Sequence, residues 1–244
     1  MTHIFGPVSS RRLGVSLGLD VIPFKTCSYD CVYCECGPTT LKTMERKPYV
    51  PAETVIAELK AHLSAHPGRL DHITFSGSGE PTLNSEIGLM IDAIKKMTST
   101  PVVVLTNSSL LHLPDVIRDL RHADLVVPSL DAASEKNFRI IDRPIGQANP
   151  GQTIAAIENF RKNFKGQLWL EILFIDGFNT SDEEVLLLRK AVDRIRPDRI
   201  QLNTVDRPPL FDWVRPASRE TLERLAGLIG FKPYDIILPK NDPS

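Results

Sequence analysis

Four cysteines near the start of the chain are the residues best suited to chemistry. They lie in the segment TCSYDCVYCECG, residues 26–37, in which Cys27, Cys31 and Cys34 have the spacing CxxxCxxC and Cys36 follows two residues later. Disulfides across such short loops would remove little entropy from the unfolded chain, so the spacing favours a metal site. One loop with three thiolates can surround a [4Fe–4S] cluster and leave one iron without a protein ligand. That iron is then free to bind a substrate or cofactor directly.

A structural zinc site is the alternative, because four thiolates could close the tetrahedral shell that zinc prefers. It would need Cys36 as its fourth ligand, and a cysteine two residues after Cys34 is awkwardly placed to chelate the same ion. Paired zinc-binding motifs also usually bring their second cysteine pair from a distant segment. The spacing therefore favours the iron–sulfur cluster, with Cys36 as a neighbour rather than a ligand.

The elements that must position these cysteines alternate along the chain. Strands are expected within residues 14–24 and at 72–75, 101–105, 125–130, 168–175 and 199–205. Apolar residues recur at helical spacing within residues 55–63, 87–94, 116–120, 157–164 and 185–195. Asn84 and Ser181 are expected to begin two of these helices.

This alternation predicts right-handed βαβ units around a parallel sheet. There are about six such units, fewer than a closed barrel needs, so we expect an α/β fold of the partial (β/α)6 barrel type, an open parallel sheet with outer helices. A doubly wound sheet is the alternative. In both architectures the ligand site lies beyond the carboxyl ends of the strands, and the cysteine segment directly follows the first expected strand.

The composition suits one globular domain. With 244 residues, of which 42% are hydrophobic, we expect a single domain over residues 1–244, in which 231–244 form either a mobile tail or the start of a further element. Lys and Arg total 29 against 30 for Asp and Glu, so the charge gives no evidence for binding nucleic acid or a membrane. No stretch resembles a signal peptide or a membrane span, and the expected location is the cytoplasm.

Small and polar residues follow the later strands and are candidates for binding a ligand. After the second expected strand come Gly77, Ser78, Gly79 and Glu80; Asn107 follows the third strand, Ser129 and Asp131 the fourth, and Asn203 lies near the end of the sixth. Glycine lets a backbone approach a ligand closely, and a carboxylate suits an ammonium group. Glu171 lies inside an apolar strand, where a carboxylate is costly without a partner, so we expect it to face the barrel interior.

The CxxxCxxC motif after a first strand, at the head of β/α units, resembles the radical SAM superfamily. The resemblance implies a partial (β/α)6 barrel, a [4Fe–4S] cluster on Cys27, Cys31 and Cys34, and S-adenosylmethionine as cofactor. The N-terminal FGPVSSRRLG and IPFKTCSYDCVYC are similar to a largely uncharacterised branch with a GPVPSRRLG-type opening; Ser9 stands where that branch usually has proline. Arg11 and Arg12 belong to this pattern, and they either reach the site or form a solvated basic pair.

The resemblance also implies roles for individual residues. Tyr33, one residue before the last ligand cysteine, would lie against the adenine. The segment of residues 77–80 looks like the family's GGEP-type segment, which holds the amino group of the methionine moiety, although Ser78 stands where many members carry glycine. Asn107, Ser129 and Asp131 would bond the ribose and the methionine carboxylate. Arg143 is either a partner of that carboxylate or a surface arginine, and Asn203 would contact the cofactor or the substrate.

The implied chemistry is reductive cleavage of S-adenosylmethionine to a 5'-deoxyadenosyl radical, which abstracts hydrogen from an unidentified substrate. An electron donor of low potential, such as a flavodoxin or ferredoxin, is the implied partner. Because no cysteine follows Cys36, an auxiliary cluster is not expected, and neither is the two-cysteine route of methyl transfer. An activating enzyme for a glycyl-radical protein and a non-catalytic zinc domain remain the alternatives.

Overall fold

The computed structural model describes residues 2–207, 209 and 211–239. Its principal strands are β1 (Ile4–Ser10), β2 (Gly14–Leu19), β5 (His72–Phe75), β6 (Val102–Thr106), β7 (Leu125–Pro128), β8 (Gln167–Phe174), β9 (Arg199–Thr204) and β10 (Tyr234–Ile237). Two short strands, β3 (Thr26–Cys27) and β4 (Leu41–Lys42), pair with each other in the cysteine segment. The helices are α1 (Ala52–Ala65), α2 (Ile87–Met97), α3 (Pro114–Leu120), α4 (Glu135–Ile141), α5 (Pro150–Asn163), α6 (Asp182–Ile195) and α7 (Arg219–Ile229), with a 3-10 turn at Pro81–Leu83.

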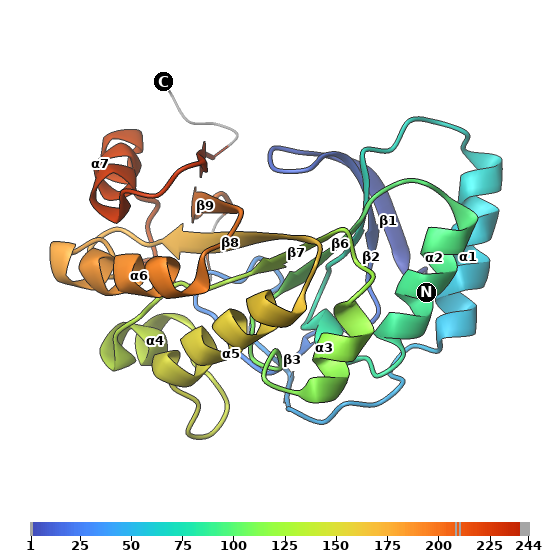
Figure 1. Ribbon diagram of the computed structural model, residues 1–244, viewed down its shortest axis with the longest axis horizontal. Helices are drawn as coiled ribbons and strands as arrows, with labels where there is room; N and C mark the ends of the chain where they lie inside the picture. The colour runs from blue at the N-terminus through green and yellow to red at the C-terminus, as the bar shows by residue number, and fades with distance from the viewer. Residues whose placement is uncertain (1, 208, 210, 240–244) are drawn as a thin grey trace.

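The principal strands form one curled, open sheet in the order β1-β2-β5-β6-β7-β8-β9-β10. From β2 to β10 all neighbouring strands are parallel, and only β1 pairs antiparallel, with β2. Figure 1 shows α1, α2, α3, α5 and α6 as an arc along the outside of this sheet. The expected α/β half-barrel is therefore confirmed: the six expected strands are β2 and β5–β9, and β10 adds a further parallel strand at the edge.

The central strands are buried on both faces, which explains their nearly continuous apolar sequence. Val102 and Val104 of β6 pack in the main core with the outer helices, whereas Val103 packs in a separate cluster with Leu125 and Val127 of β7. Leu13, in the turn between β1 and β2, is 5% exposed and belongs to that second cluster. The hairpin turn thus covers the face of the sheet that the helices do not cover.

The two expected helix starts had different outcomes. Ser181 caps α6 as expected, since its hydroxyl accepts a hydrogen bond from the N–H of Glu184. The expectation for Asn84 was wrong: α2 begins at Ile87 with Glu86 as its N-cap. The amide of Asn84 is instead buried and donates to the carbonyls of Val21 and Val50, at 3.0 and 2.9 Å. It therefore ties the residues that follow β2 to those that precede α1.

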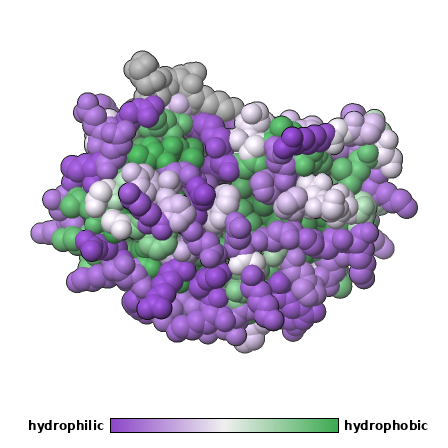
Figure 2. All heavy atoms as spheres, turned by 45° about the horizontal axis from the view of Figure 1, so that its top comes forward, coloured by the Kyte–Doolittle hydropathy of each residue, from purple (hydrophilic) through white to green (hydrophobic). Residues whose placement is uncertain are grey.

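The face turned forward in Figure 2 is largely hydrophilic, with apolar side chains gathered in patches. The exposed large apolar side chains include Phe5 and Val8 of β1 and Trp213 after β9. In the part of the chain that the structure describes, no helix is both long and apolar enough to cross a lipid bilayer.

Candidate functional site

The cysteine segment lies where the carboxyl ends of the parallel strands meet, directly after β2. Its backbone is tied to the end of α4, because the N–H of Asp30 donates to the carbonyl of Asp142 and the N–H of Val32 to that of Ile141, at 3.1 and 2.9 Å. Within the segment, the N–H of Cys34 donates to the carbonyl of Cys31 at 3.1 Å. These bonds hold three cysteines on one compact loop at the mouth of the half-barrel.

The four thiols are free and only partly exposed. Burial raises the pKa of Cys27 to about 11, with a further contribution from the Glu80 carboxylate, and burial together with Asp142 raises the pKa of Cys31 well above its ordinary value. Cys27 and Cys34 also lie close enough to Cys31 for their charges to raise its pKa. Such thiols become thiolates when a positively charged metal centre takes the place of their protons. The donor set therefore fits a metal cluster.

A single ion fits this arrangement less well. Among the residues that the structure describes, no three His, Cys, Asp or Glu side chains lie close enough together to hold one metal ion. A tetrahedral zinc site requires such a group, because all its ligands bind the same ion at about 2 Å. A cubane cluster makes a different demand, since each cysteine binds a different iron.

Two hydrogen-bond donors point at the sulfur atoms. The ammonium of Lys25, which is 2% exposed, lies 3.0 Å from Sγ of Cys34, and the side-chain amide of Asn107 donates to Sγ of Cys27 at 3.4 Å. A buried ammonium is costly unless a negative charge balances it, and a thiolate supplies that charge. Donors to sulfur are also the groups that tune iron–sulfur centres. This observation agrees with thiolate ligands at both cysteines.

The glycine-rich segment after β5 packs directly on the cysteine loop. Gly77 has φ +138°, and a side chain there would put its Cβ 2.4 Å from Cγ of Asp20. The Asp20 carboxylate accepts from the backbone N–H and the hydroxyl of Ser78, at 3.0 and 2.7 Å. A Cβ on Gly79 would lie 2.0 Å from the carbonyl oxygen of Thr26. Gly79 is therefore required for close backbone contact with the cysteine segment, and Gly77 for the close approach of the Asp20 side chain.

Glu80 is enclosed rather than presented at the surface. It is 2% exposed, and one carboxylate oxygen accepts from the N–H and hydroxyl of Thr82 and from the hydroxyl of Thr106, at 3.1, 2.6 and 2.7 Å. The other oxygen accepts from the N–H of Asn107 at 2.7 Å. Burial raises the pKa of Glu80 above its ordinary value. The carboxylate thus joins the glycine-rich segment to the end of β6, and its predicted contact with an ammonium group stays a prediction.

Residues 21–189 of the chain match the family model described as the radical SAM superfamily. The chain belongs to the radical SAM superfamily. The match spans the cysteine loop, the glycine-rich segment and the strands from β5 to β8.

Relatives of this radical SAM protein include a UPF0026 protein of Methanocaldococcus jannaschii, 33% identical over 242 residues, which cover 99% of this chain and 74% of the relative. A protein of Brachyspira hyodysenteriae named GTPase Obg is 41% identical over 222 residues, 91% of this chain but 32% of that protein. The chain therefore spans about a third of the second relative. A crystal structure of SuiB from Streptococcus suis bound to S-adenosylmethionine has the same fold, with a TM-score of 0.67 at 15% identity, covering 91% of this chain and 50% of that one.

In this radical SAM protein, the predicted residues of the fourth strand end meet the cysteine loop. The hydroxyl of Tyr33 donates to the carboxylate of Asp131, whose other oxygen accepts from the N–H of Leu173 at 2.8 Å. Burial raises the pKa of Asp131 to about 7. Ser129 lies on the neighbouring backbone and forms a β-bridge with Glu171. The structure therefore brings Tyr33, Asp131 and Ser129 into one region.

Glu171 has the partner that its place in an apolar strand requires. Its carboxylate accepts from the guanidinium of Arg12 and from the side-chain amide of Asn203, the latter at 2.8 Å. In the same turn, Arg11 forms an ion pair with Asp206 at 2.7 Å. The hairpin turn of β1 and β2 is thus bound to β8 and to the end of β9. Sequence reasoning named Glu171 and Asn203 but could not pair them with an arginine some 160 residues away.

Arg143 packs on an aromatic ring and not on a carboxylate. Its guanidinium lies over the ring of Phe211, 4.7 Å from the centroid, and its backbone carbonyl accepts from the ammonium of Lys42 at 2.7 Å. Residue 143 also has φ +45°, an uncommon value for a side-chain-bearing residue. Its predicted pairing with the methionine carboxylate is untested. The aromatic residues near it, Phe211 and Trp213, stack at 5.6 Å between centroids and carried no signal in the sequence.

Lys25 and Asp20 are the site residues that sequence reasoning missed. A lysine two residues before a cysteine motif is ordinarily solvent-exposed, and its burial follows from the loop between β2 and β3, where it has φ +55°. Asp20 directly follows β2, and nothing near it in the sequence indicates that its carboxylate binds a segment almost sixty residues later. Both become recognisable only when the loops are folded together.

Proposed function

We propose that the protein is an enzyme that carries a [4Fe–4S] cluster on Cys27, Cys31 and Cys34 and cleaves S-adenosylmethionine reductively. The observation that carries the proposal is the arrangement of three thiols on one loop, with N–H donors from the buried Lys25 and the half-buried Asn107 directed at two of them. When bound, the cluster and S-adenosylmethionine would supply a 5'-deoxyadenosyl radical that abstracts hydrogen from a substrate still to be identified.

The chain's own residues hold and orient the reacting groups. Lys25 and Asn107 stabilise negative charge on sulfur. The carboxylates of Asp20 and Glu80 fix the glycine-rich segment to the end of β2 and to the end of β6, and the N–H of Glu80 donates to the carbonyl of Thr26 in the cysteine segment at 3.2 Å. Tyr33, held by Asp131, is proposed to lie against the adenine. Backbone groups of residues 77–80, with Ser129, Asp131, Glu171 and Asn203, are proposed to complete the cofactor site, and Arg143 to bind a carboxylate at its rim.

The location of the enzyme, its domain organisation and its electron donor are proposed on the same basis. We place the enzyme in the cytoplasm, where thiols stay reduced, as a single domain that receives electrons from a flavodoxin or ferredoxin. The alternative of a glycyl-radical activating enzyme shares all these features and differs only in its substrate, a protein.

The test uses anaerobically purified and reconstituted protein. We expect about four irons per chain, as one cubane requires, and formation of 5'-deoxyadenosine from S-adenosylmethionine under reducing conditions. A Cys31→Ala variant should lose both, whereas the matched Cys36→Ala variant should keep both, because Cys36 is not a proposed ligand. Full activity of the Cys31→Ala protein would refute the ligand assignment, and loss of iron in the Cys36→Ala protein would favour a site with four thiolates.

Glu80 needs a separate experiment, because its carboxylate already has four hydrogen-bond donors. We expect a Glu80→Gln variant to retain its iron and to bind S-adenosylmethionine more weakly, as measured by equilibrium dialysis. Unchanged affinity would leave Glu80 with the structural role alone. An exposed residue of α7, as Glu223→Gln, serves as the control for the change of charge.

A further inference from the structure

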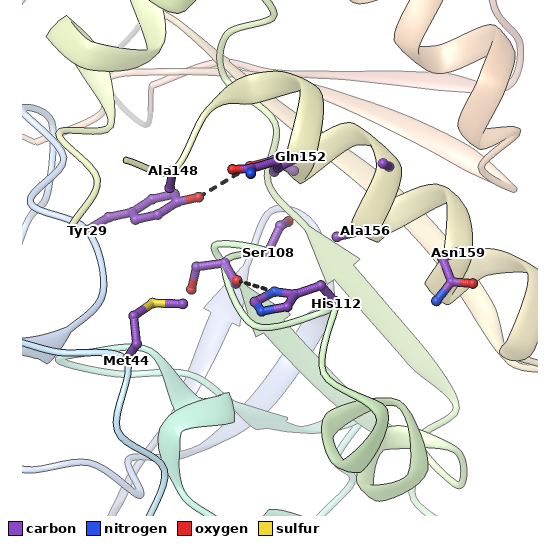
Figure 3. Close-up of a pocket in the computed structure, with 11 residues that line it drawn as sticks. Tyr29, Met44, Ser108, His112, Ala148, Gln152, Ala156 and Asn159 are labelled. Atoms are coloured by element: carbon purple, nitrogen blue, oxygen red, sulfur yellow. Dashed lines mark hydrogen bonds between the residues drawn. The ribbon is translucent and has the colours of Figure 1, made fainter. Parts of the chain in front are cut away.

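A cavity of about 410 Å³ opens beside the cysteine loop, between α5 and the segment that follows β6. Figure 3 shows Tyr29, Met44 and His112 directed toward a common space below α5, with Gln152, Ala156 and Asn159 on the helix. Its volume lies in the range of about 300–1,000 Å³ that small-molecule sites occupy. None of the residues proposed for the cofactor lines it.

The lining defines the chemistry of a ligand. Among the described residues that line it there is no Asp, Glu, Lys or Arg, although 24% of the chain is charged. Met44, Ala148 and Ala156 give apolar walls, and the ring of Tyr29 adds an aromatic one. The amides of Gln152 and Asn159 lie on an exposed helix face and can each donate and accept. An uncharged, flat ring with hydrogen-bonding edges matches this combination.

Some polar groups that line the cavity keep unused hydrogen-bonding capacity. The hydroxyl of Tyr29 lies 3.5 Å from the hydroxyl of Thr153, which is at the limit of a hydrogen bond and leaves the Tyr29 hydroxyl able to bond to a ligand. The Thr153 hydroxyl donates to the carbonyl of Asn149 at 3.3 Å, so it can still accept a hydrogen bond. Both residues are buried, at 3% and 6% exposure. His112 uses one ring nitrogen for the carbonyl of Ser109, at 3.0 Å, so that its other nitrogen remains for a ligand or water.

The cavity shares a wall with the cysteine loop. Tyr29 lies between two of the proposed ligands, and Cys27, Cys31 and the cavity residue Ala148 pack in one cluster with it. Ser109 of the cavity is hydrogen-bonded to Ser28 at 2.6 Å. Tyr33, by contrast, packs in a different cluster with Val32 and Leu173. The cavity therefore lies behind the loop, one layer of side chains from two thiols and away from the proposed adenine side.

We propose that this cavity is a second ligand site, which takes an uncharged heteroaromatic ring such as that of a nucleoside or a flavin and stabilises the cysteine loop through Tyr29. The binding claim stands independently of the proposed reaction, because it uses no cluster and no S-adenosylmethionine. Filling the cavity presses on Tyr29 from the side opposite the proposed cofactor, so the ligand would also restrict the movement of Cys27 and Cys31.

The experiment uses the Cys34→Ala protein, which keeps Cys27 and Cys31 and is expected to lack a cluster. Adenosine, riboflavin and their monophosphates, AMP and FMN, are each titrated into this protein. Binding is followed by thermal shift or, for the flavins, by fluorescence. We expect one of the two rings to bind saturably and its monophosphate at least about tenfold more weakly, because the cavity offers no cation to a phosphate. The ring that binds identifies the source of the ligand.

Two tryptophan variants locate the binding. Ala155 is an exposed cavity residue of α5, and Ala155→Trp should fill the entrance and weaken binding at least about tenfold. Leu186 is 46% exposed on α6 and does not line the cavity, so Leu186→Trp should leave the affinity unchanged. A failure of both rings to saturate, or equal affinity of the Ala155→Trp and Leu186→Trp proteins, would overturn the site.

The link to the loop has its own readout. With the binding ring present, labelling of Cys27 and Cys31 by N-ethylmaleimide should slow several-fold in the Leu186→Trp protein and not in the Ala155→Trp protein. Equal labelling rates with and without the ring would overturn the proposed coupling. Neither result depends on turnover, so a failure of the proposed enzymatic function would leave this test intact.

Discussion

The buried ammonium of Lys25 gives the most direct way to test whether Cys34 acts as a charged ligand. Lys25→Met removes the charge and keeps nearly the same length, and the bond that is lost measures 3.0 Å between Nζ and Sγ. Hydrogen bonds that involve a charged group contribute about 1.5–3 kcal/mol. Because reduction adds negative charge next to this ammonium, its removal should make the cluster harder to reduce.

The expected size of the effect follows from that range. A tenfold change in a one-electron equilibrium, about 1.4 kcal/mol, corresponds to about 59 mV. We therefore expect the midpoint potential to fall by roughly 60 mV in the Lys25→Met protein, and about 130 mV would be the most that one such bond supports. A redox titration of reconstituted protein, followed by the electron paramagnetic resonance of the reduced cluster, measures this shift.

Lys42→Met is the matched control. This lysine lies on the same segment, in β4, but its ammonium is exposed and donates to a backbone carbonyl rather than to sulfur. Its removal changes the net charge equally and should shift the potential much less. Equal shifts of the potential in both variants would show that the change of net charge, and not the hydrogen bond to sulfur, causes the effect. An unchanged potential in the Lys25→Met protein would refute the contact between Lys25 and Cys34.

Three further predictions concern stability, each measured by urea unfolding. The side chain of Arg46 is 8% exposed and pairs with Asp119 at 2.8 Å. Arg46→Met should therefore lower the free energy of unfolding by about 3–5 kcal/mol, and a loss under about 1 kcal/mol would contradict a buried pair. Asn179 is fully buried, and its side-chain oxygen accepts from the N–H of Ile175 at 2.7 Å. Asn179→Leu should lower the free energy of unfolding by about 2–4 kcal/mol, and an unchanged value would mean that water replaces the amide. A hydrogen bond from a backbone N–H lowers the pKa of Asp71. Its stabilisation is therefore present at neutral pH and lost as the pH falls below about 4, so that Asp71→Asn should weaken the protein at pH 7 and not in acid.

The parts of the fold that sequence reasoning found are those in which the pattern is local. The runs of Val102–Val104 and Leu125–Val127 are buried on both faces, and this alone identifies parallel strands. The strand β1 escaped detection because its side chains are mostly exposed and it contains Pro7, so that no buried face marks it. The strand β10 falls in the segment for which a further element was one of two expectations; residues 240–244 lie outside the described part of the chain.

The candidate site also has a part that the sequence predicts and a part that it does not. The spacing of three cysteines on one loop is visible in the sequence because all ligands are within eight residues. The hydrogen-bond partners within the site are distant in sequence, because Asn107 lies 80 residues from Cys27 and Arg12 lies 159 residues from Glu171. Short polar residues at strand ends have many ordinary uses in turns and caps. Their pairing therefore depends on the curvature of the sheet, which no local pattern encodes.

The turn between β1 and β2 has a consequence for the size of whatever reacts here. Leu13 fills the hollow of the half-barrel among Val103 and Leu125, and Arg12 is anchored beside it on Glu171. The turn between the first two strands, rather than the parallel strands, therefore closes this part of the hollow. In the proposed reaction, the depth to which a reactant could descend from the rim that bears the thiols is limited there by one leucine side chain and one ion pair.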